Sequence, residues 1–359
     1  MNKEKVKNSQ ELICNDIAAV VKKLPLLAKR LSGKTLLLTG ASGFLPSYIV
    51  DTIAWLNDHV LTSPCSLILI VRSPVTPEGR LGHLLNRKDV FFIQQSVSIP
   101  LKLERHIDFI IHAASPASPK SYLANSIETM DVNVVGTRQL LDIARENDVE
   151  SFLFFSSGEI YGEVDNKFVP TPETYFGNVD CTGPRACYTE SKRYGETLCS
   201  VYWQEYKVPV KMVRPFHVYG PGMLLDDGRI IAALLKDRVN NQPIHLLSDG
   251  TGMRAFCYVA DATVGFWEAL LSDCNGQSFN IGNDQEQTSI RDLAKLVSIL
   301  DNPELSVTCQ RSTADHLKEA PARACPDITK ARELLNYDPQ VSLWDGLQKT
   351  LAWHISRLK

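Results

Sequence analysis

The sequence predicts an α/β protein in which a doubly wound parallel sheet precedes a smaller α+β lobe. Short apolar runs alternate with helical stretches, beginning at Thr35–Thr39 and ending at Val210–Val213. Apolar runs of about five residues are typical of strands buried on both faces of a parallel sheet, and alternation with helices is typical of doubly wound folds. Beyond Pro215 the pattern loosens, with turn clusters at residues 220–222 and 248–252.

The expected elements follow one another along the chain. Residues Glu11–Leu31 have apolar side chains at helical spacing and predict a helix ahead of the first strand. Further helices are expected at Phe44–Asn57, Ser121–Glu146 and Ala186–Tyr206. Strands are expected at Thr35–Thr39, Ser66–Val71, Val90–Gln94, Asp108–His112, Ser151–Phe155 and Val210–Val213. We therefore expect an N-terminal helical extension (1–32), a sheet domain (33–215) and a region that forms mainly the C-terminal lobe (216–359).

The composition argues against several classes of protein. The chain has 359 residues, with 38 Lys+Arg against 41 Asp+Glu and a formal net charge of -3. Proteins that coat nucleic acid or anionic membranes normally carry a basic excess. The longest apolar runs are far shorter than the ~20 residues of a membrane span, and the charged N-terminus lacks the apolar core of a secretory signal. The nine cysteines are scattered without a C-x-x-C pair, which indicates neither a zinc site nor a disulfide framework. We expect a cytoplasmic protein without a metal, nucleic-acid or membrane partner.

A glycine turn follows the first strand. It reads Thr39-Gly40-Ala-Ser-Gly43-Phe44-Leu45-Pro46 and opens the next helix. Glycines here let the backbone approach a pyrophosphate, and the helix N-terminus offers N–H groups to it. The turn predicts a Rossmann-type, dinucleotide-binding domain. Pro46 replaces the third glycine of the usual fingerprint, and because proline is tolerated in the first turn of a helix we expect altered packing rather than lost binding.

The second strand leaves the choice of dinucleotide open. Such strands usually end in an acid that binds the adenosine ribose hydroxyls of NAD. Here the strand ends Leu69-Ile70-Val71-Arg72-Ser73, without an acid. An arginine at this place can bind the 2′-phosphate of NADP, although a solvent-facing side chain is an equal alternative. The expected cofactor is therefore NAD or NADP.

A tyrosine and a lysine share one face of a predicted helix. Tyr188 and Lys192 are separated by one helical turn. A nearby ammonium stabilises a phenolate, which makes the tyrosine a usable acid or base near neutral pH. This spacing is common on protein surfaces. It gains meaning from Ser157, which follows the strand Ser151–Phe155 and offers a hydroxyl to a substrate oxygen.

These motifs together resemble the extended short-chain dehydrogenase/reductases, the family of nucleotide-sugar epimerases and dehydratases. The likeness runs from about residue 33 to the C-terminus. The closest group is the UDP-glucuronate decarboxylases, on the segments His112–Pro119, Gly183–Tyr188, Asp227–Arg229 and Arg254–Val259. The resemblance implies a dinucleotide in the Rossmann-type domain, a sugar nucleotide in the C-terminal lobe, and a homodimer.

The resemblance also assigns roles to individual residues. It implies that the catalytic residues are Ser157, Tyr188, Lys192 and Glu159. It implies that the cofactor lies against Gly40, Ser42, Gly43, Phe44, Leu45, Arg72, Ala113, Tyr188 and Lys192. It implies that the substrate contacts Asn133, His217, Arg229 and Arg254, with the Arg229 guanidinium suited to diphosphate oxygens.

Several positions depart from the family pattern. Gly158 stands where the dehydratases have an aspartic acid, so a 4,6-dehydratase is disfavoured. Ala324 stands where the decarboxylases have an arginine for the glucuronate carboxylate, with Arg323 one residue early. His217 replaces an asparagine; it can donate to a phosphate or a sugar hydroxyl, or be a packed neutral residue. Ser96-Val97 replaces the Asp-Val that holds adenine.

These observations lead to an oxidoreductase that acts at C4 of a nucleotide-linked hexose. The first expectation is NAD(P)H-dependent reduction of a dTDP-4-keto-6-deoxyhexose, because Arg72 suits NADPH and Ala324 opposes decarboxylation. The alternative is a UDP-glucuronate decarboxylase, followed by a 4-epimerase and by an inactive sugar-nucleotide-binding homologue. The sequence leaves open the nucleotide base, the sugar, the stereochemistry at C4 and the release of cofactor in each cycle.

Overall fold

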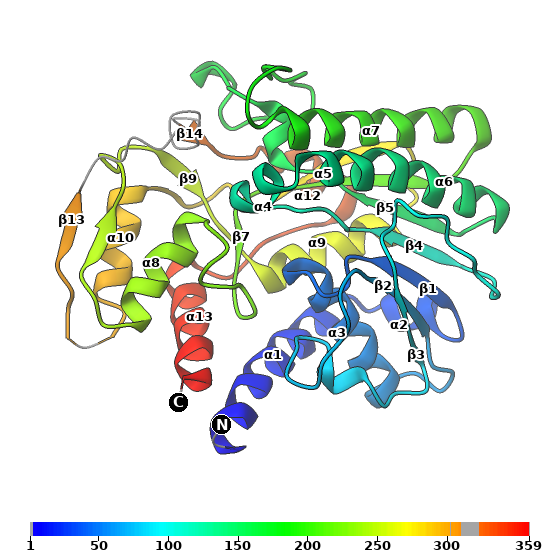
Figure 1. Cartoon of the computed structure of the whole chain (residues 1–359), viewed down its shortest axis with the longest axis horizontal. Helices are drawn as coiled ribbons and strands as arrows, with labels where there is room; N and C mark the ends of the chain where they lie inside the picture. The colour runs from blue at the N-terminus through cyan, green and yellow to red at the C-terminus, as the bar shows by residue number, and fades with distance from the viewer. Residues whose placement is uncertain (1–2, 302, 310–322, 359) are drawn as a thin grey trace.

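The core of the molecule is a parallel sheet. The computed structural model describes residues 3–301, 303–309 and 323–358, and its largest sheet has seven strands in the order β11-β6-β5-β4-β1-β2-β3 (Figure 1). The chain order reverses between β1 and β4, and ligands of open α/β sheets bind at such a switch point, beyond the carboxyl ends of the strands. The predicted doubly wound sheet is confirmed. Its strands are β1 (Thr35–Thr39), β2 (Ser66–Val71), β3 (Val90–Gln94), β4 (Phe109–His112), β5 (Ser151–Phe155), β6 (Val210–Pro215) and β11 (Gln277–Ile281).

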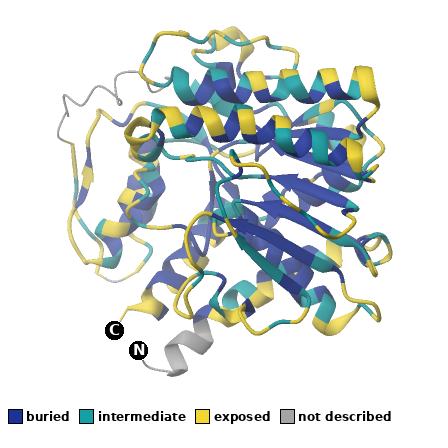
Figure 2. Ribbon diagram, turned by 45° about the vertical axis from the view of Figure 1, so that its right-hand side comes forward, coloured by how far each residue is buried: buried dark blue, intermediate teal, exposed yellow. Residues whose placement is uncertain are grey.

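Helices cover both faces of the sheet, which explains why its strands are apolar along their whole length. On one face lie α6 (Thr137–Glu146) and α7 (Ala186–Tyr206), and on the other α3 (Phe44–His59) and α9 (Val259–Leu271) (Figure 1). Figure 2 shows the strands as buried and the outer sides of the helices as exposed. No helix within the described ranges combines the length and the apolar character of a membrane span.

The predicted long helix at Ser121–Glu146 is broken in the structure. It divides into α4 (Pro119–Ala124), α5 (Ser126–Asp131), a π-helical turn (Val132–Gly136) and α6. Asn125 interrupts the helix between α4 and α5 with φ -137° and ψ 53°. A π turn inserts one extra residue into a helix and occurs often beside functional sites.

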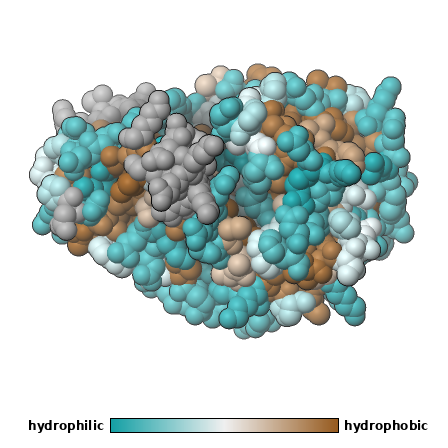
Figure 3. All heavy atoms as spheres, turned by 90° about the horizontal axis from the view of Figure 1, so that it is seen from below, coloured by the Kyte–Doolittle hydropathy of each residue, from teal (hydrophilic) through white to brown (hydrophobic). Residues whose placement is uncertain are grey.

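The N-terminal extension also forms two helices rather than one. The chain bends at Pro25, between α1 (Lys3–Lys23) and α2 (Leu27–Leu31), because proline is excluded from a helix interior. Asp16 on α1 is buried and accepts hydrogen bonds from Tyr258 (2.6 Å), Tyr48 (3.4 Å) and Lys349 (3.4 Å). These bonds join α1 to α3, β10 (Cys257–Tyr258) and α13 (Leu343–Arg357). Seen from below, the molecule is largely hydrophilic, with its hydrophobic side chains in separate groups (Figure 3).

The C-terminal lobe lies at one end of the sheet (Figure 1). Its helices α8 (Ile230–Val239) and α10 (Ile290–Ser298) pack against each other. Its strands form three small sheets: β12 (Gln287–Ser289), β9 (Met253–Ala255) and β14 (Arg323–Ala324); β13 (Val307–Cys309) and β8 (Ile244–Leu246); β10 and β7 (Val218–Tyr219). Between these elements the chain returns to the main sheet through α9, β11 and α12 (Thr329–Leu335). The lobe is therefore discontinuous within residues 216–359.

Candidate active site

A cavity of about 1280 Å³ lies beyond the carboxyl ends of β1, β4 and β5, between the sheet and the lobe. It brings together nearly all the residues that the sequence analysis selected. Those that line it are Gly40, Ser42, Gly43, Phe44, Leu45, Arg72, Ala113, Ser157, Glu159, Tyr188, Lys192, His217, Arg229 and Arg254. The cavity is larger than the ~300–1000 Å³ of most small-molecule sites, so it has room for two ligands.

The glycine turn forms the floor of the cavity near β1. Gly40 has φ +70°, and a Cβ atom there would lie 2.7 Å from Ala114 Cα, so only glycine fits between the ends of β1 and β4. Gly43 is the N-cap of α3, with no side chain capping the first turn. The free N–H groups of this turn suit a pyrophosphate.

A buried hydroxyl nearby also fits a ligand in this cavity. Ser156 is 4% exposed, lines the cavity, and its Oγ has no hydrogen-bond partner among the described residues. A buried polar atom without a partner is costly unless a ligand or water supplies one. Together with the glycine turn, this hydroxyl fits a bound dinucleotide.

Arg80, which the sequence analysis missed, connects the glycine turn to the lobe. Its guanidinium lines the cavity and donates to Ser42 O at 2.6 Å and to Gly222 O. Gly222 belongs to the turn that leads into the lobe. Arg80 thus holds the two ligand-binding halves of the cavity together. No local pattern in the sequence marks it, because its partners are backbone carbonyls distant in the chain.

The candidate catalytic residues lie on adjacent elements. Ser157 caps the 3₁₀ turn Gly158–Tyr161 directly after β5, and its Oγ accepts from Glu159 N at 3.1 Å. Tyr188 lies in the first turn of α7. Enclosure and the charge of Glu159 raise the pKa of Tyr188, while a hydrogen bond with Ser157 and the charge of Arg229 lower it. The phenol is therefore neutral at pH 7, a form that can donate a proton to a substrate oxygen.

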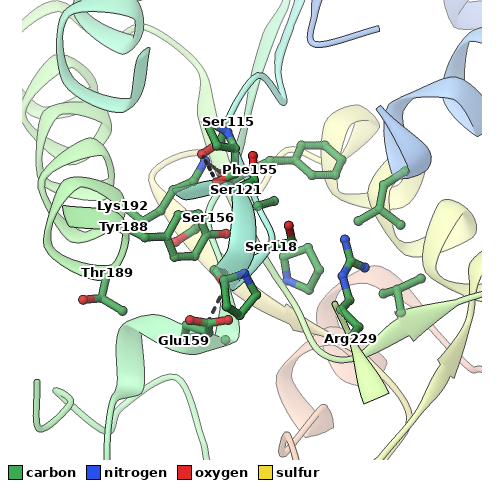
Figure 4. Close-up of a pocket in the computed structure, with 18 of the residues that line it drawn as sticks. Ser115, Ser118, Ser121, Phe155, Ser156, Glu159, Tyr188, Thr189, Lys192 and Arg229 are labelled. Atoms are coloured by element: carbon green, nitrogen blue, oxygen red, sulfur yellow. Dashed lines mark hydrogen bonds between the residues drawn. The ribbon is translucent and has the colours of Figure 1, made fainter. Parts of the chain in front are cut away.

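Lys192 lies one turn further along α7 and is buried (Figure 4). Its Nζ donates to Phe155 O at 2.6 Å and lies 5.0 Å from the centre of the Phe154 ring. Burial lowers the pKa of Lys192 to about 7. Lys192 Nζ is thus held by the carbonyl at the end of β5, and its effect on the Tyr188 phenol stays a prediction.

Glu159 is an acid whose charge acts on the Tyr188 phenol. Enclosure raises the pKa of Glu159, whereas Arg185, Tyr122 and Arg229 lower it. Arg185 Nη1 lies 3.6 Å from Glu159 Oε2, and the Tyr122 hydroxyl donates to the same oxygen at 3.3 Å. This carboxyl can therefore exchange a proton closer to neutral pH than an ordinary glutamate.

Arginines line the side of the cavity that the lobe contributes. Arg229 is the N-cap of α8 and Arg254 lies on β9. Figure 4 shows Arg229 across the cavity from Tyr188. Enclosure and the charges of Arg254 and Arg229 lower the pKa of His217 to about 3, so its imidazole is neutral at pH 7. This wall suits an anionic ligand.

Comparison with known proteins identifies the family. The model of the NAD dependent epimerase/dehydratase family matches residues 36–282, more than half of the chain. The chain belongs to this family. The predicted resemblance is thereby confirmed, and the cofactor of the family, NAD, agrees with the glycine turn and the Ser156 hydroxyl described above.

Individual members give a finer comparison. UDP-glucuronic acid decarboxylase 1 of Arabidopsis thaliana is 35% identical over 317 residues, covering 88% of this chain and 69% of that protein. UDP-glucuronic acid decarboxylase 1 of Danio rerio is 33% identical over 330 residues, covering 91% and 74%. UDP-glucuronic acid 4-epimerase from Bacillus cereus, solved with UDP-glucuronic acid and NAD, superimposes with a TM-score of 0.72 at 26% identity, over 89% of this chain and 98% of that one.

One residue of this chain that was predicted to contact the substrate, Asn133, does not line the cavity. Asn133 lies in the π turn, is fully buried, and donates its Nδ2 to Ser191 Oγ at 2.9 Å. This bond holds the π turn against α7, while Asn133 Oδ1 has no hydrogen-bond partner among the described residues. The contact of Asn133 with the substrate stays a prediction.

The departure from the family pattern at Gly158 has a packing cause. A Cβ atom at this residue would lie 2.9 Å from two atoms of the Phe216 ring. A side chain here, such as the aspartic acid of the dehydratases, would require the Phe216 ring to shift. The structure thus agrees with the argument against a dehydratase.

Proposed function

We propose that this chain is a nucleotide-sugar decarboxylase that acts on UDP-glucuronate by way of a ketone at C4. The observation that carries the proposal is the set of four arginines that line the cavity. Arg185, Arg229, Arg254 and Arg323 all line the cavity. A nucleotide diphosphate and a hexuronate carboxylate together need several such cations, whereas a neutral 6-deoxyhexose needs fewer. The two decarboxylase relatives, at 35% and 33% identity, support the same assignment.

The chemistry assigned to the site is proton transfer at C4 and C5 of the hexose. Bound NAD would supply the hydride acceptor for oxidation of the C4 hydroxyl and the hydride donor for the later reduction of the ketone. The Glu159 carboxylate can take the proton that the C4 hydroxyl loses in the oxidation. A ketone at C4 makes the substrate a β-keto acid, whose C5–carboxyl bond breaks with release of CO2, and the electron pair moves onto the C4 oxygen. The neutral phenol of Tyr188 and the hydroxyl of Ser157 can donate to that oxygen. Glu159, close to both, is placed to exchange the proton at C5.

The strongest sequence argument against decarboxylation is that Ala324 stands where the decarboxylases have an arginine. Arg323, its neighbour, can answer this argument. Strand β14 pairs with β9 so that both Arg323 and Ala324 line the cavity. Arg323 donates from Nε (2.9 Å) and Nη2 (2.6 Å) to the amide oxygen of Gln287. Because Gln287 is neutral, these bonds orient the guanidinium without cancelling its charge. Residue 323 can thus supply the carboxylate partner that residue 324 lacks.

The reductase of a dTDP-4-keto-6-deoxyhexose is the second candidate. Arg72 at the end of β2 favours it, because a net reductase can use NADPH. We prefer the decarboxylase for two reasons. The relatives that match this chain over most of their length are decarboxylases, and the arginines of the cavity suit an additional anion.

The test is to incubate the purified protein with UDP-glucuronate and to measure CO2 and UDP-pentose. We expect both CO2 and UDP-pentose to form without added reductant. Conversion to UDP-galacturonate without CO2 would indicate a 4-epimerase. NADPH oxidation with a dTDP-4-keto-6-deoxyhexose, and no CO2 from UDP-glucuronate, would establish the reductase instead.

An arginine variant tests the carboxylate assignment. Arg323→Gln should lower kcat/KM for UDP-glucuronate by about 10- to 100-fold, as loss of a charge-assisted hydrogen bond requires. Its matched control is Arg291→Gln, because Arg291 also lies in the lobe and donates to a carbonyl, that of Asp249, but does not line the cavity. Equal activity of the two variants would remove Arg323 from the site.

We also propose that the protein is a homodimer. Exposed apolar side chains gather on neighbouring helices of one face of the sheet: Leu123, Ile127, Met130, Val135, Tyr194 and Val201. Since α5 and α7 pack side by side, these residues can form one surface for a second copy. Light scattering should give about twice the 40.0 kDa chain mass, and Ile127→Lys with Val201→Lys should give the monomer. A monomeric wild-type protein would refute the proposal.

A reducing compartment such as the cytoplasm is proposed for this protein. All nine cysteines are free thiols, and four of them are buried. Buried thiols without disulfides are typical of proteins kept in a reducing environment. Location of a tagged full-length chain by cell fractionation tests the assignment.

A further inference from the structure

Tyr122 on α4 lies directly behind the candidate catalytic residues. It is 0% exposed and does not line the cavity, so it touches no ligand there. Its carbonyl accepts hydrogen bonds from Ser126 Oγ (3.2 Å) and Cys187 Sγ (3.8 Å). The first bond joins α4 to α5, and the second attaches α4 to the first turn of α7, which carries Tyr188.

The ring of Tyr122 stacks on the ring of Tyr188. The ring centres are 4.9 Å apart and the planes differ by 8°. Such a contact leaves the Tyr188 ring no room to rotate toward α4. It therefore favours the orientation in which the phenol meets Ser157 and faces the cavity.

The hydroxyl of Tyr122 contacts the second reactive group. It donates to Glu159 Oε2 at 3.3 Å. Burial and the charge of Glu159 raise the pKa of Tyr122, so that it stays a neutral donor at all physiological pH values. One side chain thus contacts both the phenol and the carboxyl of the site.

We propose that Tyr122 is a positioning residue that sets the orientation of the Tyr188 phenol by stacking and the protonation of Glu159 by hydrogen bonding. The part that concerns turnover rests on the proposed function; the contacts themselves do not. The two contacts separate chemically, because Tyr122→Phe keeps the ring and removes only the donor, whereas Tyr122→Leu removes both.

The sign of the effect on Glu159 follows from the groups that face it. Arg185 from the start of α7, Arg229 from the start of α8 and Tyr122 from α4 all favour the charged carboxylate, and only enclosure opposes it. Removing the Tyr122 donor must raise the pKa of Glu159. Tyr188 stays neutral over this range and contributes no charge.

The first experiment needs no turnover. In protein labelled with ¹³C at glutamate Cδ, the Glu159 signal, assigned by its loss in Glu159→Gln, is followed through a pH titration. Tyr122→Phe should raise its midpoint by about 0.5–1 pH unit, the size expected for one weak charge-assisted hydrogen bond. The matched control is Tyr202→Phe, which removes another hydroxyl-to-carboxylate bond, from Tyr202 on α7 to Asp142 Oδ1 (2.6 Å), away from the cavity. An unchanged midpoint in Tyr122→Phe overturns the hydrogen-bonding part.

The second measurement tests the stack. With tyrosine labelled at Cζ, the Tyr188 signal, assigned by its loss in Tyr188→Phe, should shift or broaden in Tyr122→Leu and stay near its wild-type position in Tyr122→Phe. The thermal midpoint of each variant is measured in parallel, so that unfolding is recognised. A wild-type Tyr188 signal in folded Tyr122→Leu overturns the stacking part.

Kinetics then connect the contacts to catalysis. Tyr122→Leu should lower kcat at least about tenfold, because a misplaced reacting group is costly, with KM changed less than about threefold. Tyr122→Phe should move the acidic limb of the pH–rate profile upward and restore most of kcat at higher pH. A change in KM alone would show a merely structural role. If the wild-type protein turns over no sugar nucleotide, the proposed function fails, while the Glu159 titration and the Tyr188 signal still decide the contacts of Tyr122.

Discussion

Arg72 Nη1 lies 2.7 Å from Glu128 Oε1, so the end of β2 is joined to α5 across one end of the cavity. Both side chains line that cavity. The end of β2 has no acid of its own, but Glu128 of α5 brings a carboxylate to the same place. Glu128 can accept from ribose hydroxyls or repel a 2′-phosphate, whereas Arg72 can attract the phosphate. We therefore predict that the pair influences the choice between NAD and NADP.

Changing this pair should change cofactor affinity in opposite directions. Glu128→Gln should tighten NADP+ relative to NAD+ by up to about fivefold, and Arg72→Asp should weaken NADP+ relative to NAD+ by a similar factor, the range expected for exposed charges. Calorimetric titration with each cofactor measures the ratio of Kd values. If both variants keep the wild-type ratio of Kd values, neither side chain discriminates between the two cofactors at the ribose.

Tyr188→Phe should lower turnover by about 10²- to 10⁴-fold, because the phenolic proton is the one that the site can deliver to the C4 oxygen. The Kd of the sugar nucleotide should stay within a few-fold of the wild-type value, since the ring itself is kept. Tyr206→Phe, at an exposed position of the same helix, is the control. Full activity of Tyr188→Phe would refute the acid/base role.

Gly158→Ala should destabilise the protein. The new Cβ would meet two atoms of the Phe216 ring at 2.9 Å, and overpacking of this kind costs about 1–3 kcal/mol. Denaturant unfolding of the single variant, and of the double variant with Phe216→Leu, measures the cost. The smaller side chain should recover part of it, and a loss that is equal in both backgrounds would mean that Phe216 is not the obstacle.

Asp16→Asn should remove a pH dependence of stability. Burial raises the pKa of Asp16, and the bonds from Tyr258 and Lys349 offset this only in part. The folded state therefore holds this proton more tightly than the unfolded state, so the free energy of unfolding falls as the pH rises through the window above the ordinary pKa. The wild-type protein should gain stability relative to Asp16→Asn as the pH is lowered from neutral toward the ordinary pKa of 3.8. Unfolding free energies of the two proteins that change in parallel over this range would contradict the assignment.

The elements of the sheet are accessible to sequence reasoning because burial on both faces demands a continuous apolar run. Strand β2 and helix α7 have the predicted bounds. The helix predicted over Ser121–Glu146 was wrong because the break at Asn125 and the π turn depend on how α5 and α7 pack. Strand β11 was missed because its five residues, Gln277–Ile281, carry a mixed pattern and are held by hydrogen bonds to β6.

The amino-acid sequence by itself determined the fold class and the family, and it selected the candidate reactive groups, because strands, glycine turns and tyrosine–lysine pairs are local patterns in the chain. Tertiary structure alone decided which distant groups share the cavity. It placed Glu128 against Arg72 and brought Arg323 to the cavity, and it bound Asn133 to Ser191 on α7. It also put Tyr122 behind Tyr188. The physical reason is that charge balance and ring contacts depend on distances in space, which elements far apart in the chain set only when they pack together.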